Sequence, residues 1–270
     1  MSKLMINEQL CTKCGTCSDF CVTKIISTTS DGWPEISPEK ALACIMCGHC
    51  ESFCPSKALT LDFNVEAKLK TKEKNQIQID LESLFKNRRS IRHFKSDTVK
   101  SEDIEKIIDI ARYAPTGGNS QTVQWTIVQN SNDVKTIASL TVEWLKTIIN
   151  SDHPLSDFAP FVISMFESGM DIISNGAPCM VFSHIPENKL KDATDSIIAM
   201  SHFDLIAPAY GVGTCWAGFV LMALNGYAPL REFLSLENRL TGGAVMIGYP
   251  VLKPVTIPGR KSPAIIYKHS

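Results

Sequence analysis

Two cysteine runs near the start of the chain have the same spacing. Residues 11–21 read CTKCGTCSDFC and residues 44–54 read CIMCGHCESFC. Each run contains three cysteines separated by two residues, and a fourth cysteine three residues further on. Eight of the ten cysteines of the chain lie in these runs. Repetition at a fixed offset indicates two copies of one binding unit.

Disulfides and structural zinc are the alternatives for so many thiols. Disulfides need an oxidising compartment, and residues 1–10 contain one lysine and no apolar run of signal-peptide length. Zinc sites often pair two C-x-x-C units, but they give no reason for a third and fourth cysteine at repeated offsets. We therefore favour iron–sulfur clusters, and an analysis of iron against zinc would decide between these alternatives.

Three thiolates spaced by two residues can surround one face of an iron–sulfur cubane, and a fourth, three residues on, ligates the other cluster. The two runs would then complete each other. The predicted ligands of one cluster are Cys11, Cys14, Cys17 and Cys54, and those of the other are Cys44, Cys47, Cys50 and Cys21. Residues 3–63 resemble the bacterial ferredoxins with two [4Fe-4S] clusters. One departure is Val22, which follows Cys21, whereas Pro55 follows Cys54.

Length and charge limit the remaining possibilities. The chain has 270 residues, which suits two domains, and its formal net charge of −1 does not favour a nucleic-acid partner. An uncharged stretch, residues 205–230, is long enough to span a membrane, but Pro208, Gly211, Gly213 and Gly218 divide it. We expect two buried pieces joined by a turn, and a soluble, cytoplasmic protein without a membrane partner.

A domain boundary is expected where the sequence becomes highly charged. Residues 66–76 carry four lysines and two glutamates and little that is apolar. Such a segment is typical of a hydrated linker. The predicted organisation is a two-cluster domain over 1–65, a charged linker over 66–77 and a larger domain over 78–270.

The larger domain alternates helical patterns with few, very apolar strands. Helices are expected at residues 79–90 (with Asp80 as N-cap), 101–115, 133–150, 159–173 and 192–211 (with Asp192 as cap). Strands are expected at 123–130, 178–185 and 243–251. The class is α+β or α/β, and we predict α+β, with a central sheet that helices cover.

Four polar or glycine-rich segments of this domain could bind a cofactor. RRSIRHF (88–94) offers guanidinium groups and a hydroxyl that suit a phosphate. YAPTGGNSQTVQW (113–125) offers amides that suit a ring edge bearing carbonyl and N–H groups. YGVGTCWAGF (210–219) is expected to form a tight, buried, glycine-rich turn whose N–H groups need partners. GYPVLKPVTIPGRK (248–261) ends in two further cations. Each segment alone could also be an ordinary capped turn or a solvated helix end.

From about residue 80 to the C-terminus, the order of these segments resembles the flavin-dependent nitroreductase family. The resemblance implies a homodimer with FMN at the subunit interface. By position, it assigns Arg88, Ser90 and Arg260 to the FMN phosphate, with Arg89 and Lys261 assisting. It assigns Arg92, Asn119 and Gln121 to the ring edge and ribityl chain, and the backbone of Trp216, Ala217 and Gly218 to the vicinity of flavin N5. Thr122-Val123 departs from the family pattern, in which a proline follows the glutamine.

Joining the two domains predicts an FMN oxidoreductase that receives single electrons through its two [4Fe-4S] clusters. The donor would be ferredoxin or NAD(P)H. A nitroaromatic, quinone or enone would take two electrons from flavin N5. Two alternatives stay open: an electron carrier or redox sensor without small-molecule turnover, and a specialised reductive dehalogenase or ring reductase. No side chain is assigned as catalytic, and Cys179 and Cys215 are expected to be buried packing residues.

Overall fold

The computed structural model describes residues 5–21, 23–60, 74–188, 193–252, 257 and 261–268. The chain divides into two compact units. The Cys-rich unit comprises Met1–Lys72 together with Thr116–Gln121, and the larger unit comprises Glu73–Pro115 together with Thr122–Ser270. Most of the predicted linker lies outside the described residues.

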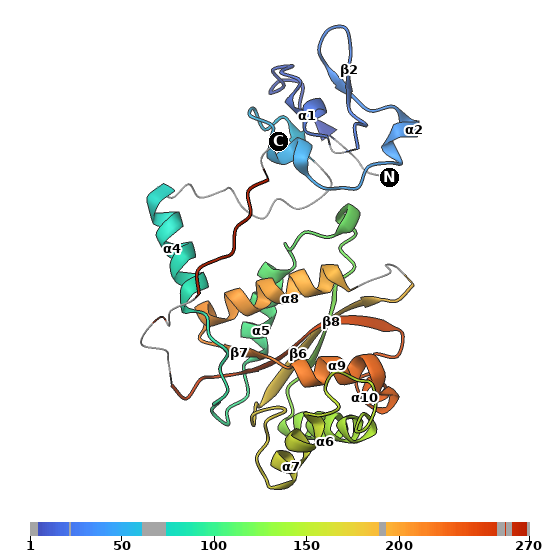
Figure 1. The fold of residues 1–270 in the computed structure, drawn as a ribbon. Helices are drawn as coiled ribbons and strands as arrows, with labels where there is room; N and C mark the ends of the chain where they lie inside the picture. The colour runs from blue at the N-terminus through green and yellow to red at the C-terminus, as the bar shows by residue number, and fades with distance from the viewer. Residues whose placement is uncertain are drawn as a thin grey trace. The chain divides into compact units, whose positions relative to one another are not determined.

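The Cys-rich unit is built from very short elements (Figure 1). Its strands are β1 (Met5–Ile6), β2 (Ser27–Thr28), β3 (Pro34–Glu35) and β4 (Leu59–Thr60), and its helices are α1 (Thr16–Asp19), α2 (Pro38–Ala41), α3 (His49–Ser52) and the 3-10 helix η1 (Gly117–Asn119). β1 pairs with β4 and β2 pairs with β3, both antiparallel. Between α1 and α3 the rings of Phe20 and Phe53 stack with their centroids 4.5 Å apart.

The larger unit is organised around an antiparallel sheet with the strand order β5-β6-β8-β7. The strands are β5 (Gln124–Val128), β6 (Cys179–Pro186), β7 (Gly213–Trp216) and β8 (Arg239–Gly248). The helices are α4 (Lys74–Asn87), α5 (Ser101–Ala111), α6 (Ser131–Thr147), α7 (Ala159–Glu167), α8 (Thr194–Ile206), α9 (Gly218–Gly226), α10 (Ala228–Phe233) and the 3-10 helix η2 (Ala207–Tyr210).

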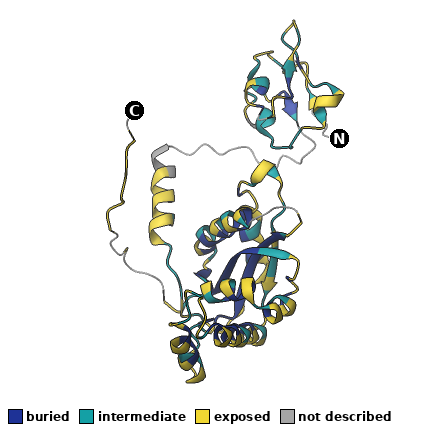
Figure 2. Ribbon diagram, turned by 45° about the vertical axis from the view of Figure 1, so that its right-hand side comes forward, coloured by how far each residue is buried: buried dark blue, intermediate teal, exposed yellow. Residues whose placement is uncertain are grey.

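Helices cover both faces of this sheet. α5 and α8 pack on one face, and α6, α7, α9 and α10 pack on the other. Figure 2 accordingly shows the central strands in the buried colour. The prediction of a central sheet covered by helices is confirmed.

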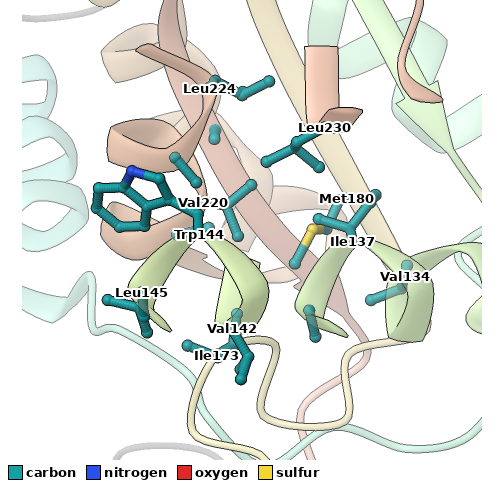
Figure 3. Packing of buried hydrophobic residues seen from close by; sticks show 14 of the residues in the cluster. Val134, Ile137, Val142, Trp144, Leu145, Ile173, Met180, Val220, Leu224 and Leu230 are labelled. Carbon is teal, nitrogen blue, oxygen red and sulfur yellow. The ribbon is translucent and has the colours of Figure 1, made fainter. Parts of the chain in front are cut away.

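The sequence of the strand β6 is almost continuously apolar because both of its faces are buried. Cys179 and Val181 point into the hydrophobic cluster under α5 and α8, whereas Met180 and Phe182 point into the cluster under α6 and α9. Figure 3 shows the second cluster, where side chains of α6, α9 and α10 meet Met180. A strand that is buried on both faces is apolar at most of its positions.

Several predicted boundaries were wrong. The first helix starts at Lys74 rather than near Asp80, and side-chain pairs four residues apart, such as Glu82–Lys86 at 2.8 Å, support it. The helix predicted to reach residue 173 ends at Glu167, because Gly169 adopts a left-handed φ of 90°. The predicted cap Asp192 lies outside the described residues.

The uncharged stretch 205–230 does not form one long element. Pro208 lies in η2, and the chain then continues as β7, α9 and α10. In the part of the chain that the structure describes, no helix combines the length and the apolar character needed to cross a membrane.

Candidate functional site

The eight cysteines of the two runs line two separate cavities in the Cys-rich unit. One cavity has Cys11, Cys14, Cys17 and Cys54 in its wall. The other has Cys21, Cys44, Cys47 and Cys50 in its wall. Among the residues described, no three Cys, His, Asp or Glu side chains form a group that would hold a metal ion.

The backbone around the two cavities repeats along with the sequence. Left-handed φ angles recur at equivalent positions of the two runs, at Lys13 and Met46, Gly15 and Gly48, and Lys24 and Lys57. The helices α1 and α3 likewise start immediately after the two glycines. The sets of cysteines that the sequence predicts as cluster ligands are therefore brought together by two copies of one local fold, and their role as ligands stays a prediction.

Thiols in these cavities experience different environments. Burial raises the pKa of Cys17 and raises that of Cys50 to about 11. A hydrogen bond with Thr16 lowers the pKa of the exposed Cys14, whose Sγ lies 3.3 Å from the Thr16 hydroxyl. The backbone N–H of Ala58 donates to Cys54 Sγ at 3.3 Å. Because iron binds thiolates, assembly of the predicted clusters at Cys17 and Cys50 would release protons.

In the larger unit, the predicted phosphate-binding segment runs along the edge strand β7. Ser90 forms a parallel bridge with Thr214, and the N–H of Ile91 donates to the Thr214 carbonyl at 2.8 Å. Gly213 permits this approach, since a Cβ atom there would lie 2.9 Å from the Ile91 side chain. The segment is thereby fixed beside the strand from which Trp216 and Ala217 continue.

A buried carboxylate holds this arrangement together. Asp204 of α8 is 6 % exposed. It accepts a hydrogen bond from the Thr214 hydroxyl and another from the Trp216 indole N–H at 3.3 Å. Its Oδ2 also lies 3.5 Å from Nη1 of Arg88. One carboxylate thus connects α8, β7 and the first arginine of the predicted phosphate site.

The other predicted cations near β7 have distinct positions. Nη1 of Arg89 donates to the carbonyl of Arg88 at 2.6 Å, so the backbone uses one of its guanidinium donors. Arg92 is exposed. Burial raises the pKa of Cys215, and Arg92 and Ser90 act on it in the opposite direction, which indicates that both lie near this thiol.

The conformation of residues 213–216 differs from the prediction. It was expected to be part of a glycine-rich turn, but Gly213–Trp216 pairs with β8 as the strand β7. Only Gly211, with φ of 73°, has the left-handed backbone of a turn. Gly218 begins α9 directly after the strand, and a Cβ atom there would meet no atom within 4 Å. The amino end of α9 is therefore open to a ligand.

The flavin contacts assigned to the remaining residues stay a prediction. Asn119 and Gln121 belong to Thr116–Gln121 of the Cys-rich unit, where the Asn119 amide contacts the second cysteine run. Lys261 is exposed, and Arg260 lies outside the described residues. Cys179 and Cys215 are buried and burial raises the pKa of both, which confirms that they are packing residues.

The sequence analysis did not predict that Asp204 and Thr214 take part in the candidate site. A signal existed for Asp204, because it is an acid in the last turn of a largely apolar helix and must find a partner if that helix is buried. Thr214 gave no such signal, since its role depends on the pairing of a strand that the sequence did not reveal.

The larger unit is therefore an α+β domain with a helix-covered antiparallel sheet, and an arginine-bearing segment lies beside the strand β7 that precedes α9. A profile of the Nitroreductase family matches residues 85–249. This match covers more than half of the chain, so the protein belongs to the nitroreductase family and is an oxidoreductase.

A relative in Archaeoglobus fulgidus, described as an NADH dehydrogenase/NAD(P)H nitroreductase, is 27% identical over 164 residues, which are 60% of this chain and 81% of the relative. Among solved structures, a Desulfitobacterium hafniense nitroreductase with bound FMN has 21% identity and a TM-score of 0.55, and covers 69% of this chain and 97% of its own. A Bacteroides fragilis nitroreductase with bound FMN has 22% identity, a TM-score of 0.51 and coverages of 73% and 100%. These two likenesses show the fold.

Proposed function

We propose that this protein is an FMN-dependent oxidoreductase that receives single electrons through two [4Fe-4S] clusters and reduces an electron-poor organic acceptor. One observation carries the proposal. Each cavity of the Cys-rich unit is lined by the first three cysteines of one run and the last cysteine of the other. This exchange of the fourth ligand is the pattern of two-cluster ferredoxins.

The larger unit supplies residues that fit FMN. The structures from D. hafniense and B. fragilis carry FMN on the same fold. In this chain Arg88 and Ser90 would hold the phosphate, because both are fixed beside β7. The open backbone at Gly218 would face the ring, and the positive end of α9 would stabilise negative charge there. Bound clusters pass single electrons, and bound FMN combines two of them for an organic acceptor.

The proposed partners follow the same reasoning. Ferredoxin or NAD(P)H would be the donor, and the description of the A. fulgidus relative favours keeping NAD(P)H as a candidate. The acceptor class is a nitroaromatic, quinone or enone. A homodimer with FMN at its interface is supported by the apolar side chains that α4 exposes at Ile79, Leu81 and Phe85. We place the protein in the cytoplasm, where its thiols stay reduced.

Anaerobic purification with iron, sulfide and flavin analysis tests the proposal. We expect about eight irons and about one FMN per chain. Zinc in place of iron, or a colourless preparation, would overturn it.

Anaerobic turnover with a panel of acceptors then tests the electron route. We expect Cys14→Ala to lose most of its ferredoxin-driven activity, whereas Cys179→Ala, which removes a buried thiol outside the two runs, should keep it. Rapid reduction by NADH together with full activity of Cys14→Ala would show that the clusters do not feed the flavin. Transfer to proteins only, without small-molecule turnover, would identify an electron carrier.

A further inference from the structure

The segment Thr116–Gln121 interrupts the larger unit in sequence but belongs to the Cys-rich unit in space. Within it, the side-chain Nδ2 of Asn119 lies 2.9 Å from the carbonyl oxygen of Ile45 and 3.2 Å from that of Met46. These carbonyls belong to the two residues between Cys44 and Cys47. One amide group, with two protons to donate, therefore contacts both residues of the loop between Cys44 and Cys47.

The amide is held in place by its own backbone. Asn119 has a left-handed φ of 55°, which asparagine tolerates better than most residues. Its N–H donates to the Thr116 carbonyl at 3.0 Å, and the N–H of Gln121 donates to the Thr116 hydroxyl at 3.1 Å. The side chain is thus presented to the cysteine loop by a closed turn, which lowers the entropic cost of its hydrogen bonds.

The contact breaks the internal repeat of the Cys-rich unit. Met46 and its equivalent Lys13 both have left-handed φ angles, near 55°, that cost a non-glycine residue free energy and need support. Lys13 is supported by its own neighbourhood, because its Nζ lies 4.5 Å from the ring centroid of Trp33 and its Cβ packs against Gly32. Met46 is instead held through the carbonyls of the two peptide groups that flank its Cα, by a residue more than seventy positions further along the chain.

We propose that Asn119 is a positioning residue for the second cluster, holding the Cys44–Cys47 loop in its ligand-binding conformation. This inference rests on the two-cluster part of the proposed function. It reassigns Asn119 from the flavin ring edge to the cluster loop.

The test compares Asn119→Gly with wild type after anaerobic purification. Glycine keeps the left-handed backbone and removes only the amide. Asn150→Gly is the matched control, since Asn150 is an exposed asparagine of the larger unit with a φ of 59°. On exposure to air, we expect about half of the iron of Asn119→Gly to be lost roughly tenfold faster than in wild type or the control. FMN content should be unchanged.

Two further variants, each of which should lack one cluster, show which of the two clusters Asn119→Gly destabilises. In Cys14→Ser, which should retain the second cluster, Asn119→Gly should accelerate the loss of the remaining iron and of its electron paramagnetic resonance signal. In Cys47→Ser, which should retain the first cluster, it should have no effect. Unchanged iron loss, equal loss from both clusters, or loss of FMN with iron retained would overturn the inference. A wild-type protein without iron would overturn the proposed function itself. The two failures are distinguishable, because the results from the variants bear only on Asn119.

Discussion

Asp204 is an acidic side chain on an apolar helix, and its surroundings explain why it is tolerated there. Its two oxygens accept hydrogen bonds from Thr214 and Trp216 and face the guanidinium of Arg88. A buried carboxylate is stable only when such partners replace water. Removal of its charge would leave Arg88, itself largely covered, without a counter-charge.

We therefore expect Asp204→Asn to lower the free energy of unfolding by about 2 kcal/mol. Denaturant unfolding measures this change. Asp109→Asn is the matched control, because Asp109 pairs with Arg112 at 2.7 Å on the exposed surface of α5. Such a pair contributes less than about 1 kcal/mol. Equal losses in both variants would show that Asp204 is not a special anchor.

His184 predicts a pH dependence of stability. The side chain is 4 % exposed, and burial and Arg239 lower its pKa to about 4. The unfolded chain, with a histidine pKa of about 6.5, binds more protons between these values, so stability falls as pH drops from 6.5 to 4, by about 3 kcal/mol in total. We expect the difference in Tm between pH 7 and pH 5 to shrink in His184→Gln.

The hydrogen-bond partner of His184 provides the control. Its Nε2 lies 3.0 Å from the Thr126 hydroxyl, and its Nδ1 has no hydrogen-bond partner within the described residues. Thr126→Val removes the hydrogen bond but keeps the imidazole, so its melting temperature should fall at both pH values with the wild-type difference retained. If His184→Gln keeps that difference as well, another group is responsible.

At the scale of elements, β7 decides where the candidate flavin residues lie. It pairs with β8 on one side and with Ser90 and Ile91 on the other. The N–H of Lys95 donates to the Tyr249 carbonyl at 2.8 Å, and this bond fixes the far end of the same segment. The site therefore depends on close contact of two backbones rather than on side chains alone.

Gly213→Ala tests this close contact. The added Cβ would overlap Ile91, and we expect a destabilisation of about 1–3 kcal/mol, together with reduced FMN content because Arg88 and Ser90 must shift. Calorimetry and flavin absorbance measure the two effects. Gly218→Ala adds a methyl group to open space in a helix, so its melting temperature should equal or slightly exceed that of wild type. A stable Gly213→Ala protein would contradict this reading of the contact.

The same elements show what the sequence could predict. The strand β6 was predictable because most of its eight residues are apolar and turn residues bound them. The strand β7 was not, because its residues lie between Gly211 and Gly218 and resemble a turn until the pairing with β8 is known. For the candidate site, Arg88 and Ser90 were predicted from residue type, and this assignment stays a prediction. The role of Asp204 became visible only through its contacts with Thr214, Trp216 and Arg88.

At the scale of the whole molecule, the two units differ in how they are stabilised. The larger unit has extensive hydrophobic clusters on both faces of its sheet. The buried cluster of the Cys-rich unit consists of Cys17, Cys21, Ile25, Ile26 and Leu59. Two of these are themselves predicted ligands, so the unit has little apolar core apart from its cluster sites.

We accordingly expect removal of iron by a chelator to unfold the Cys-rich unit and leave the larger unit folded. Hydrogen exchange followed by mass spectrometry should show lost protection in peptides from residues 5–60 and retained protection in the strand β6. Cluster-free protein with unchanged protection at residues 5–60 would show that the short strands and helices are stable alone. Simultaneous loss in both regions would show that the two units unfold as one.

The sheet of the larger unit has further consequences for how such a protein can diversify. Since helices cover both of its faces, a small molecule cannot reach the strands through either face of the sheet. New substrates must then be accommodated by the segments that leave the strand ends. Such a fold can therefore take on a different reaction, or gain an additional electron-carrying unit, through changes outside the sheet that leave its interior packing unchanged.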